Sequence, residues 1–328
     1  MKKKNTKKSK PKTPKSKATY RVRNWTEYNK SLVNRGNLTI WISDEAMAAW
    51  YEMEKSGKRG SSITYSKLAI EACLMVKMLF KLPLRQTEGF VNSLFGMMGL
   101  AISSPDYTTL SRRLSSIEVK LPLRNLGEKL HLCIDSTGVK VYGEGEWKVR
   151  THGWSKRRTW RKLHLAIDAE TQQIVGACAT SNAVDDAAKV EDLLSQVPDG
   201  IEVEEVSADG AYDKRKTYNA LNKHGTRAII PPRKNAKIRQ HGNLKKERHM
   251  RDENLRRIRK VGTKSWKIES GYHQRSLAET GVFRYKQTFG AEVSSRKEEN
   301  QFNEMKLKCQ ILNLMTHCGM PQSEKVTI

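Results

Sequence analysis

The residues best suited to chemistry lie near the end of the chain and follow the pattern Y-x2-R-x3-E-x6-K. They are Tyr272, Arg275, Glu279 and Lys286. On an α-helix this spacing places all four side chains on one stripe. A carboxylate there offers a hard oxygen ligand to Mg²⁺, and the two cations can hold a phosphate that the carboxylate would repel. The spacing also fits an ordinary ion pair between Arg275 and Glu279 on a solvated helix face.

Two aspartates further upstream can complete a metal site with Glu279. Asp135 directly follows the apolar run at residues 130–134, and Asp209 closely follows the strand-like run at residues 201–206. We predict that each of these acids ends a strand. A charge at the end of a buried strand is costly unless it is paired or binds a cation. The three carboxylates are therefore the predicted catalytic and metal-binding residues.

Asp168 is the main competitor for this role, because it too follows an apolar run, at residues 163–167. It opens the segment Asp-Ala-Glu-Thr-Gln, which precedes a second predicted strand at residues 174–180. Acids in such hairpin connections usually form turns. We interpret Asp168 as a turn residue.

The elements that must position these acids form an α/β pattern. The order predicts a ribonuclease-H-like domain, a mixed five-stranded sheet with flanking helices, in which the acids lie on the first strand, at the end of the fourth and on a later helix. The predicted elements are a strand ending at Asp135, a strand at 139–142, a hairpin at 160–180, a helix at 185–196, a strand ending at Asp209, a helix at 214–224, a strand at 226–230 and the helix carrying Glu279.

Upstream, apolar residues at helical spacing predict a small all-α region with helices at 63–80, 85–98 and 105–116. Ser104 followed by Pro105 is a typical helix start. The last helix would display Arg112 and Arg113. This arrangement fits a helix-turn-helix with its last helix in the major groove of DNA, and it equally fits a plain helical bundle packed on the α/β domain.

With these residues in place, the chain resembles the DDE transposases of bacterial insertion sequences, in the branch (family five) with a Y-R-E-K helix. The resemblance runs from about Tyr20 to about residue 320. Asp135, Asp209 and Glu279 match the catalytic triad of the family, with no acid missing. The other three motif positions are matched by Tyr272, Arg275 and Lys286, and the segments 160–168 and 208–213 are also similar.

The resemblance implies a Mg²⁺-dependent enzyme, with Mn²⁺ as a substitute metal. Two ions held by the triad would free a 3'-OH at the element end, and that hydroxyl would attack target DNA. Arg275 and Lys286 would position phosphates, and Tyr272 would support the helix face or contact DNA. The implied partners are terminal inverted repeats, target DNA and further copies of the chain in a synaptic complex. No P-loop is present, so no nucleotide is expected. The alternatives are a related nuclease that cuts without joining and a catalytically silent DNA-binding regulator.

The net charge of +26 is concentrated in three tracts, at residues 1–25, 147–162 and 232–262. Such tracts are typical of nucleic-acid binders. Residues 1–18 are predicted to be a disordered tail that holds DNA or only aids solubility. In the second tract, aromatic and basic residues alternate and can stack on an unpaired base, whereas Trp160 is expected in the core. The third tract is either a clamp on DNA or a solvated loop. The predicted contacts in the second tract are Trp154, Lys156, Arg157 and Arg158.

Composition limits the class of protein further. The 328 residues are 37% hydrophobic, with a mean hydropathy of -0.69 and no run of the roughly 18 apolar residues that a membrane helix needs. We expect a cytoplasmic, nucleoid-associated protein without membrane partners. Five scattered cysteines predict neither disulfides nor a zinc module. The predicted domains are a basic tail at 1–20, a helical DNA-binding region at 21–125, a catalytic domain at 126–320 and a tail at 321–328.

Overall fold

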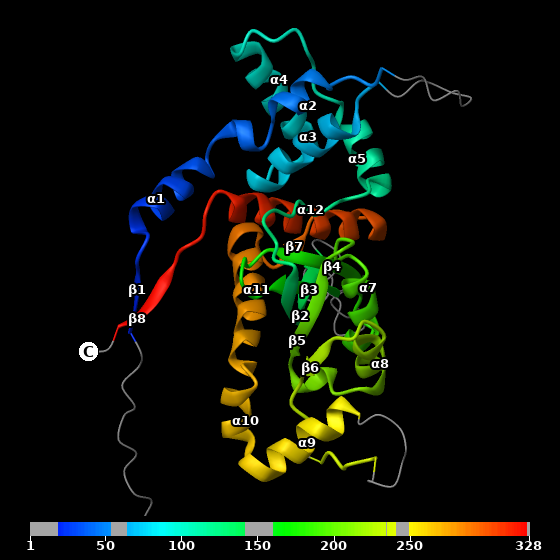
Figure 1. Cartoon of the computed structure of the whole chain (residues 1–328). Helices are drawn as coiled ribbons and strands as arrows, with labels where there is room; N and C mark the ends of the chain where they lie inside the picture. Colours follow the sequence, from blue (N-terminus) through cyan, green and yellow to red (C-terminus); the bar gives the residue numbers. More distant parts are fainter. Residues whose placement is uncertain (1–18, 54–63, 142–159, 234, 241–248, 327–328) are drawn as a thin grey trace, which may run out of the picture. The chain divides into compact units, whose positions relative to one another are not determined.

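The computed structural model in Figure 1 describes residues 19–53, 64–141, 160–233, 235–240 and 249–326. The chain divides into two compact units. The smaller unit joins the residues up to Gly36 to those from Cys318 onward, and the larger unit runs from Asn37 to His317. The predicted domain boundaries near residues 20, 125 and 320 stay predictions. The two compact units instead meet after Gly36 and before Cys318.

The smaller unit is a two-stranded sheet with one helix. Strand β1 (Thr19–Val22) pairs antiparallel with β8 (Ser323–Val326), and α1 (Trp25–Asn34) follows β1. The side-chain amide of Asn24 links the start of α1 to the segment before β8. It donates to Met320 O at 3.0 Å and accepts from Gln322 N at 2.7 Å. The segment 321–328, predicted only as a tail, thus contains a strand.

The larger unit is built on a mixed sheet of six strands (Figure 1). Five strands run in the order β4-β3-β2-β5-β6, and β7 (Glu292–Val293) pairs with the far end of β2. The pairs β2–β3 and β3–β4 are antiparallel, whereas β2–β5, β5–β6 and β2–β7 are parallel. The other strands are β2 (Lys129–Val141), β3 (Trp160–Asp168), β4 (Ile174–Ser181), β5 (Glu202–Ala208) and β6 (Arg227–Ile229).

The predicted hairpin at 160–180 and the strands leading to Asp209 and near residue 228 are confirmed. The predicted division between a strand ending at Asp135 and a second strand at 139–142 is wrong. A single strand, β2, runs through both, because its pairing with β3 continues to Lys140 beside Trp160. Its pairing with β5 stops at Ile134. With these two segments merged into β2, the sheet has the five strands predicted for it, plus β7.

Helices cover both faces of the sheet. Leu130, Leu132 and Ile134 of β2 pack in a core with residues of α7 and α8, whereas alternate β3 residues from Leu163 to Ile167 pack toward α11 and α12. The predicted helix at 185–196 begins as a 3-10 turn. These elements are η2 (Asp186–Lys189), α7 (Val190–Leu194), η3 (Gly210–Tyr212), α8 (Arg215–Lys223), α9 (Met250–Val261), α10 (Thr263–Glu269), η4 (Tyr272–Arg275), α11 (Ser276–Phe289) and α12 (Glu298–His317).

Side chains cap the starts of the upstream helices except α4, which follows Pro83. Ser66 caps α3 by accepting from Ala69 N. The predicted start of α5 at Pro105 is wrong: Asp106 is the cap, because its carboxylate accepts from the amides of both Thr108 and Thr109. The helices of this region are η1 (Leu38–Ile40), α2 (Asp44–Ala48), α3 (Lys67–Leu79), α4 (Leu84–Met97) and α5 (Tyr107–Ser116).

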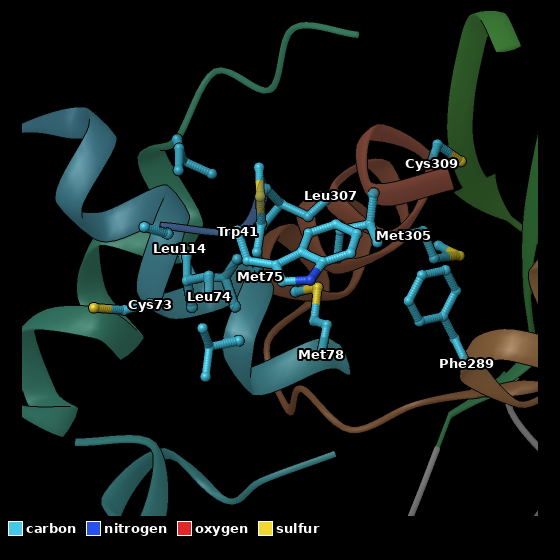
Figure 2. Close-up of a cluster of buried hydrophobic side chains, with 14 of the residues drawn as sticks. Trp41, Cys73, Leu74, Met75, Met78, Leu114, Phe289, Met305, Leu307 and Cys309 are labelled. Carbon is cyan, nitrogen blue, oxygen red and sulfur yellow. The ribbon is translucent and has the colours of Figure 1, made fainter. Parts of the chain in front are cut away.

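One hydrophobic core joins the upstream helices to the sheet. Figure 2 shows Leu74 and Met75 of α3 and Leu114 of α5 gathered with Leu307 of α12, and Phe289 of α11 lies at the edge of the group. Helix α12 is a core element, with twelve buried residues. None of the helices in the described ranges is long and apolar enough to cross a membrane.

Candidate active site

The register of the two central parallel strands brings the two predicted aspartates together. Ile134 of β2 pairs with Ala208, the last residue of β5, and Asp135 and Asp209 are the residues that follow this pair in the chain. Ile134 and Ala208 belong to the same core cluster on one face. Side chains alternate along a strand, so both acids point to the opposite face, where α11 lies.

Each aspartate also has a local reason for its position. Asp209 directly follows β5 and caps η3 by accepting from Ala211 N at 2.8 Å. It ends its strand, as predicted. Asp135 lies inside β2, so the prediction that it ends a strand is wrong. What ends there is the pairing of β2 with β5, whose last paired residues are Ile134 and Ala208.

Glu279 is carried by the first turn of α11, which packs closely on the sheet. At Gly281, two residues further along, a Cβ atom would stand only 2.1 Å from Cδ1 of Ile167 on β3. The absence of a side chain there lets the helix approach β3. The Glu279 side chain is 56% exposed and can rotate more freely than the two aspartates.

Arg275 connects the predicted acids. Its guanidinium forms an ion pair with Glu279, and its Nη1 lies 3.9 Å from Oδ2 of Asp135. Tyr272 and Arg275 belong to η4, directly ahead of α11, so the prediction that one α-helix carries all four residues is wrong. Only Glu279 and Lys286 share the helix.

The acids influence one another electrostatically. The pKa of Asp135 is raised, first by burial and then by the negative charges of Asp209 and Glu279. The Ser136 amide, which donates to Asp135 at 2.8 Å, and the charge of Arg275 act in the opposite direction. A cation placed among the three carboxylates would relieve this repulsion.

Tyr272 lies in an aromatic and cationic group beside Arg275. Its ring centroid is 5.0 Å from Lys267 Nζ, 5.9 Å from Arg275 Cζ and 5.9 Å from the centroid of the buried Trp266. Burial raises the pKa of the Tyr272 phenol, so the phenol stays neutral at physiological pH. The geometry fits the predicted supporting role, and DNA contact stays a prediction.

Several contacts that hold this site were missed at the level of sequence. Cys133 Sγ lies 3.2 Å from Gln274 O, which ties β2 to η4, and His131 Nε2 lies 2.7 Å from Ser207 Oγ, which ties β2 to β5. Tyr212 is 2% exposed, near the charge of Asp135. Only Tyr212 had a sequence signal, the motif Asp-Gly-Ala-Tyr; the other contacts join residues far apart in the chain.

The donor set suits a hard divalent cation, because Asp135, Asp209 and Glu279 offer only carboxylate oxygens. Within the described parts of the chain, no three His, Cys, Asp or Glu side chains are arranged closely enough to hold a metal ion. Glu279 pairs with Arg275 instead. Its side chain must leave that partner before all three acids can share an ion.

The remaining predicted residues lie in various surroundings. Lys286 is half-buried on α11, two turns beyond Glu279. Arg112 is exposed and donates to Thr109 Oγ1 at 3.4 Å, whereas Arg113 donates to Tyr65 O at 3.2 Å and so holds α5 to the segment before α3. The predicted contacts Trp154, Lys156, Arg157 and Arg158 fall outside the described residues, as do residues 1–18 of the basic tail.

Asp168 is confirmed as a turn residue. Its buried carboxylate accepts from both the amide and the hydroxyl of Thr171 in the β3–β4 connection. His164 is structural as well, since it is fully buried with Nε2 at 2.9 Å from Thr180 Oγ1. Neither residue belongs to the site.

Comparison with known sequences agrees with this geometry. A family model described as Transposase DDE domain matches residues 126–314, more than half of the chain, and a second with the same description matches residues 33–144. The chain therefore belongs to the transposase DDE domain family. The predicted resemblance to insertion-sequence DDE transposases is confirmed.

Two individual relatives were compared. A protein of Archaeoglobus fulgidus described as a probable transposase for insertion sequence element ISA1214 is 24% identical over 226 residues, which are 66% of this chain and 64% of the relative. The chain thus spans slightly less than two thirds of that relative. The solved Drosophila P element transposase strand transfer complex matches 62% of this chain and 43% of its own at 13% identity and a TM-score of 0.27, too weak a likeness to support an argument.

Proposed function

We propose that this chain is a transposase that binds the terminal inverted repeats of an insertion element, cleaves DNA at the element ends and transfers the resulting 3'-OH to target DNA. Asp135, Asp209 and Glu279 are the proposed catalytic acids. The observation that carries the proposal is the adjacency of Asp135 and Asp209 in the β2–β5 register, with Arg275 linking Asp135 to Glu279.

The fold in this proposal is ribonuclease-H-like. It is supported by three antiparallel strands, β4, β3 and β2, followed by β5 and β6 in parallel, with helices on both faces. In this order the first and fourth strands of the sheet, β2 and β5, are neighbours. An acid from each then meets a later helix, which is the role of α11.

Members of this family generally use a divalent metal ion, and the three carboxylates fit Mg²⁺ or Mn²⁺. Such a metal would polarise the scissile phosphodiester and lower the pKa of an attacking water. Asp135 within β2 and Asp209 at the cap of η3 would hold two sides of such an ion, and the exposed Glu279 side chain would complete the site by rotating.

Arg275 has a second task in this mechanism. If Glu279 turned toward a metal, the guanidinium would lose that ion-pair partner and keep Asp135 at 3.9 Å from Nη1. A planar guanidinium can then donate two hydrogen bonds to phosphate oxygens. Arg275 would hold the scissile phosphate against the repulsion of the acids, with Lys286 contacting phosphates two turns along α11. Tyr272 keeps the Arg275 stem in place.

The proposal is tested with a labelled duplex carrying the element end, in Mg²⁺, with wild type and Glu279→Gln compared for binding, cleavage and joining to a plasmid. We expect wild type to cleave and join, and Glu279→Gln to bind the duplex but do neither. Equal cleavage by both proteins would contradict the assignment of the site.

Two further outcomes would support other functions. Wild-type cleavage without joining, even with a precleaved end, would indicate a nuclease. Binding without metal-dependent cleavage in either protein would indicate a regulator. Joining two ends also calls for at least two copies of the chain, so the proposal includes a synaptic oligomer, which crosslinking with and without end DNA would detect.

A further inference from the structure

The basic stretch between β6 and α11 contains two helices, α9 and α10, that meet at a corner. Gly262 forms this corner with a positive φ of 83°, which favours glycine. Figure 1 shows the pair at the end of the sheet where β6 lies, away from α12. The helices carry five cations against two carboxylates in α9 and two cations against one carboxylate in α10.

The corner is a built structure, because buried carboxylates anchor α9. Asp213, four residues after the catalytic Asp209, binds Arg251 at 2.7 Å, and the two side chains are only 1% and 11% exposed. Asp252 accepts from the amides of Arg239 and Gln240 at 3.0 and 2.8 Å. The Asp213–Arg251 pair connects α9 to the turn that follows Asp209, and the Asp252 contacts connect it to residues 239–240. The basic tract at 232–262 was predicted to be either a clamp or a solvated loop. Its part from Met250 to Val261 is the helix α9, so the loop prediction is wrong for that part.

The anchors and local pairs account for most charges of the two helices. Arg256 pairs with Glu253, and Arg257 pairs with Glu269 of α10 at 2.8 Å. The exposed cations left over flank the corner, and within the described residues none of them has a carboxylate partner. We call these the corner cations: Arg259, Lys260 and Lys264.

Helix stabilisation explains only some of these positions. Arg259 and Lys260 lie in the last turn of α9, where positive charge is favourable, but Lys264 lies in the first turn of α10, where it is unfavourable. Three like charges kept together at some electrostatic cost indicate an anionic partner.

A continuous set of contacts leads from the corner to the site. Trp266 and Lys267 of α10 pack on Tyr272, which lies against Arg275. The seven residues of α10 rise only about 10 Å, well within one turn of duplex DNA, about 34 Å. A duplex with its end at the acids would have phosphates at the corner.

We propose that the α9–α10 corner is a DNA-backbone clamp, in which Arg259, Lys260 and Lys264 hold phosphates of the duplex whose end lies at the acids. This inference rests on the proposed function and adds to it the surface that grips the DNA. The corner cations would raise the affinity for duplex DNA and take no part in the chemical step.

The test compares a corner variant, Arg259→Gln/Lys260→Gln/Lys264→Gln, with a charge-matched control that replaces three exposed lysines elsewhere by glutamine. Binding of a fluorescein-labelled end duplex is measured by anisotropy over a series of salt concentrations. Each lost phosphate contact lowers the slope of log K against log salt by about 0.9, so we expect a drop of two to three for the corner variant and less than one for the control. The control lysines are Lys81, Lys120 and Lys297.

Cleavage at saturating duplex separates this inference from the proposed function. The corner variant should then cleave at nearly the wild-type rate, whereas Glu279→Gln should not cleave. Equal salt slopes for corner and control variants would overturn the clamp and leave the active site intact. Full cleavage by Glu279→Gln would overturn the active site of the proposed function and leave the clamp untouched. All substituted side chains are exposed, and a thermal melt of each variant checks that it folds.

Discussion

At the scale of single residues, Asp135 illustrates a conflict between stability and function. Its pKa is raised chiefly by burial and then by the neighbouring acids, so the charged form is unfavourable in the folded protein. The folded state holds this proton more tightly than the unfolded chain does. Stability therefore falls as pH rises above the ordinary aspartate value of 3.8. The site keeps the charge because a metal ligand must be deprotonated.

Replacing Asp135 by Asn should accordingly raise the melting temperature at neutral pH in the presence of a chelator, while abolishing cleavage. The gain should shrink toward acidic pH, where the wild-type carboxyl is protonated. Calorimetry across pH checks both effects, with the exposed Asp199→Asn as a control that leaves the melting temperature nearly unchanged. A lower melting temperature for Asp135→Asn at every pH would contradict the account.

His164 makes the opposite contribution to pH dependence. Burial lowers its pKa from 6.5 to about 4, with the carboxylate of Asp186, 3.7 Å from Nδ1, acting against the shift. The unfolded chain takes up this proton first, so stability is lost as pH falls from 6.5 toward 4. We expect His164→Gln to show a shallower decline of unfolding free energy over this range, measured by urea denaturation. Parallel curves for the two proteins would refute this role of His164.

At the scale of elements, local patterns predicted what local contacts determine. The alternation of apolar residues identified β3 and β4, and Asp168 formed the expected turn because its partner Thr171 is three residues away. Asp209 was placed correctly because a strand and a capping turn meet there.

The errors involve partners that are distant in sequence. The continuation of β2 depends on pairing with β3, and the position of Arg275 depends on Asp135, so neither can be deduced from neighbouring residues. The start of α5 was misplaced for a different reason. A carboxylate at Asp106 satisfies two amides and is a stronger cap than the Ser104 hydroxyl.

Two glycines test how closely the elements pack. A Cβ at Gly176 of β4 would lie 2.7 Å from the backbone oxygen of Leu193 in α7, whereas a Cβ at Gly89 of α4 meets nothing within 4 Å. We expect Gly176→Ala to destabilise the protein by about 1 to 3 kcal/mol, because α7 must move off the sheet. Gly89→Ala should stabilise it by about 0.5 to 1 kcal/mol through helix propensity. Urea denaturation measures both; a neutral Gly176→Ala would show that α7 shifts without cost.

At the scale of the whole molecule, the upstream helices and the sheet share one core within residues 37–317 (Figure 2). Hydrogen bonds reinforce it, since Asn300 and Asn303 of α12 donate to Ser111 O and Leu114 O of α5 at 3.2 and 2.8 Å. A predicted boundary near residue 125 falls inside this unit. The helical region should therefore unfold together with the sheet.

Truncation of a buried α5 residue tests this cooperativity. Leu110 is fully buried, so Leu110→Ala should cost about 2 to 5 kcal/mol. If the unit is cooperative, the most protected amides of β2 and β3 should lose protection by the same free energy in hydrogen-exchange mass spectrometry. Faster exchange confined to α3, α4 and α5 would show that the helices are an independent domain.

The central claim is that Asp135, Asp209 and Glu279 form one metal site even though Glu279 pairs with Arg275 in the structure. The most direct measurement is a titration of the protein with Mn²⁺, followed by electron paramagnetic resonance of the free ion. Asp135→Asn, Asp209→Asn and Glu279→Gln should each weaken binding by about tenfold or more. Asp168→Asn, at the turn, should bind as wild type does. Wild-type affinity in Glu279→Gln, or an equal loss in Asp168→Asn, would contradict the claim.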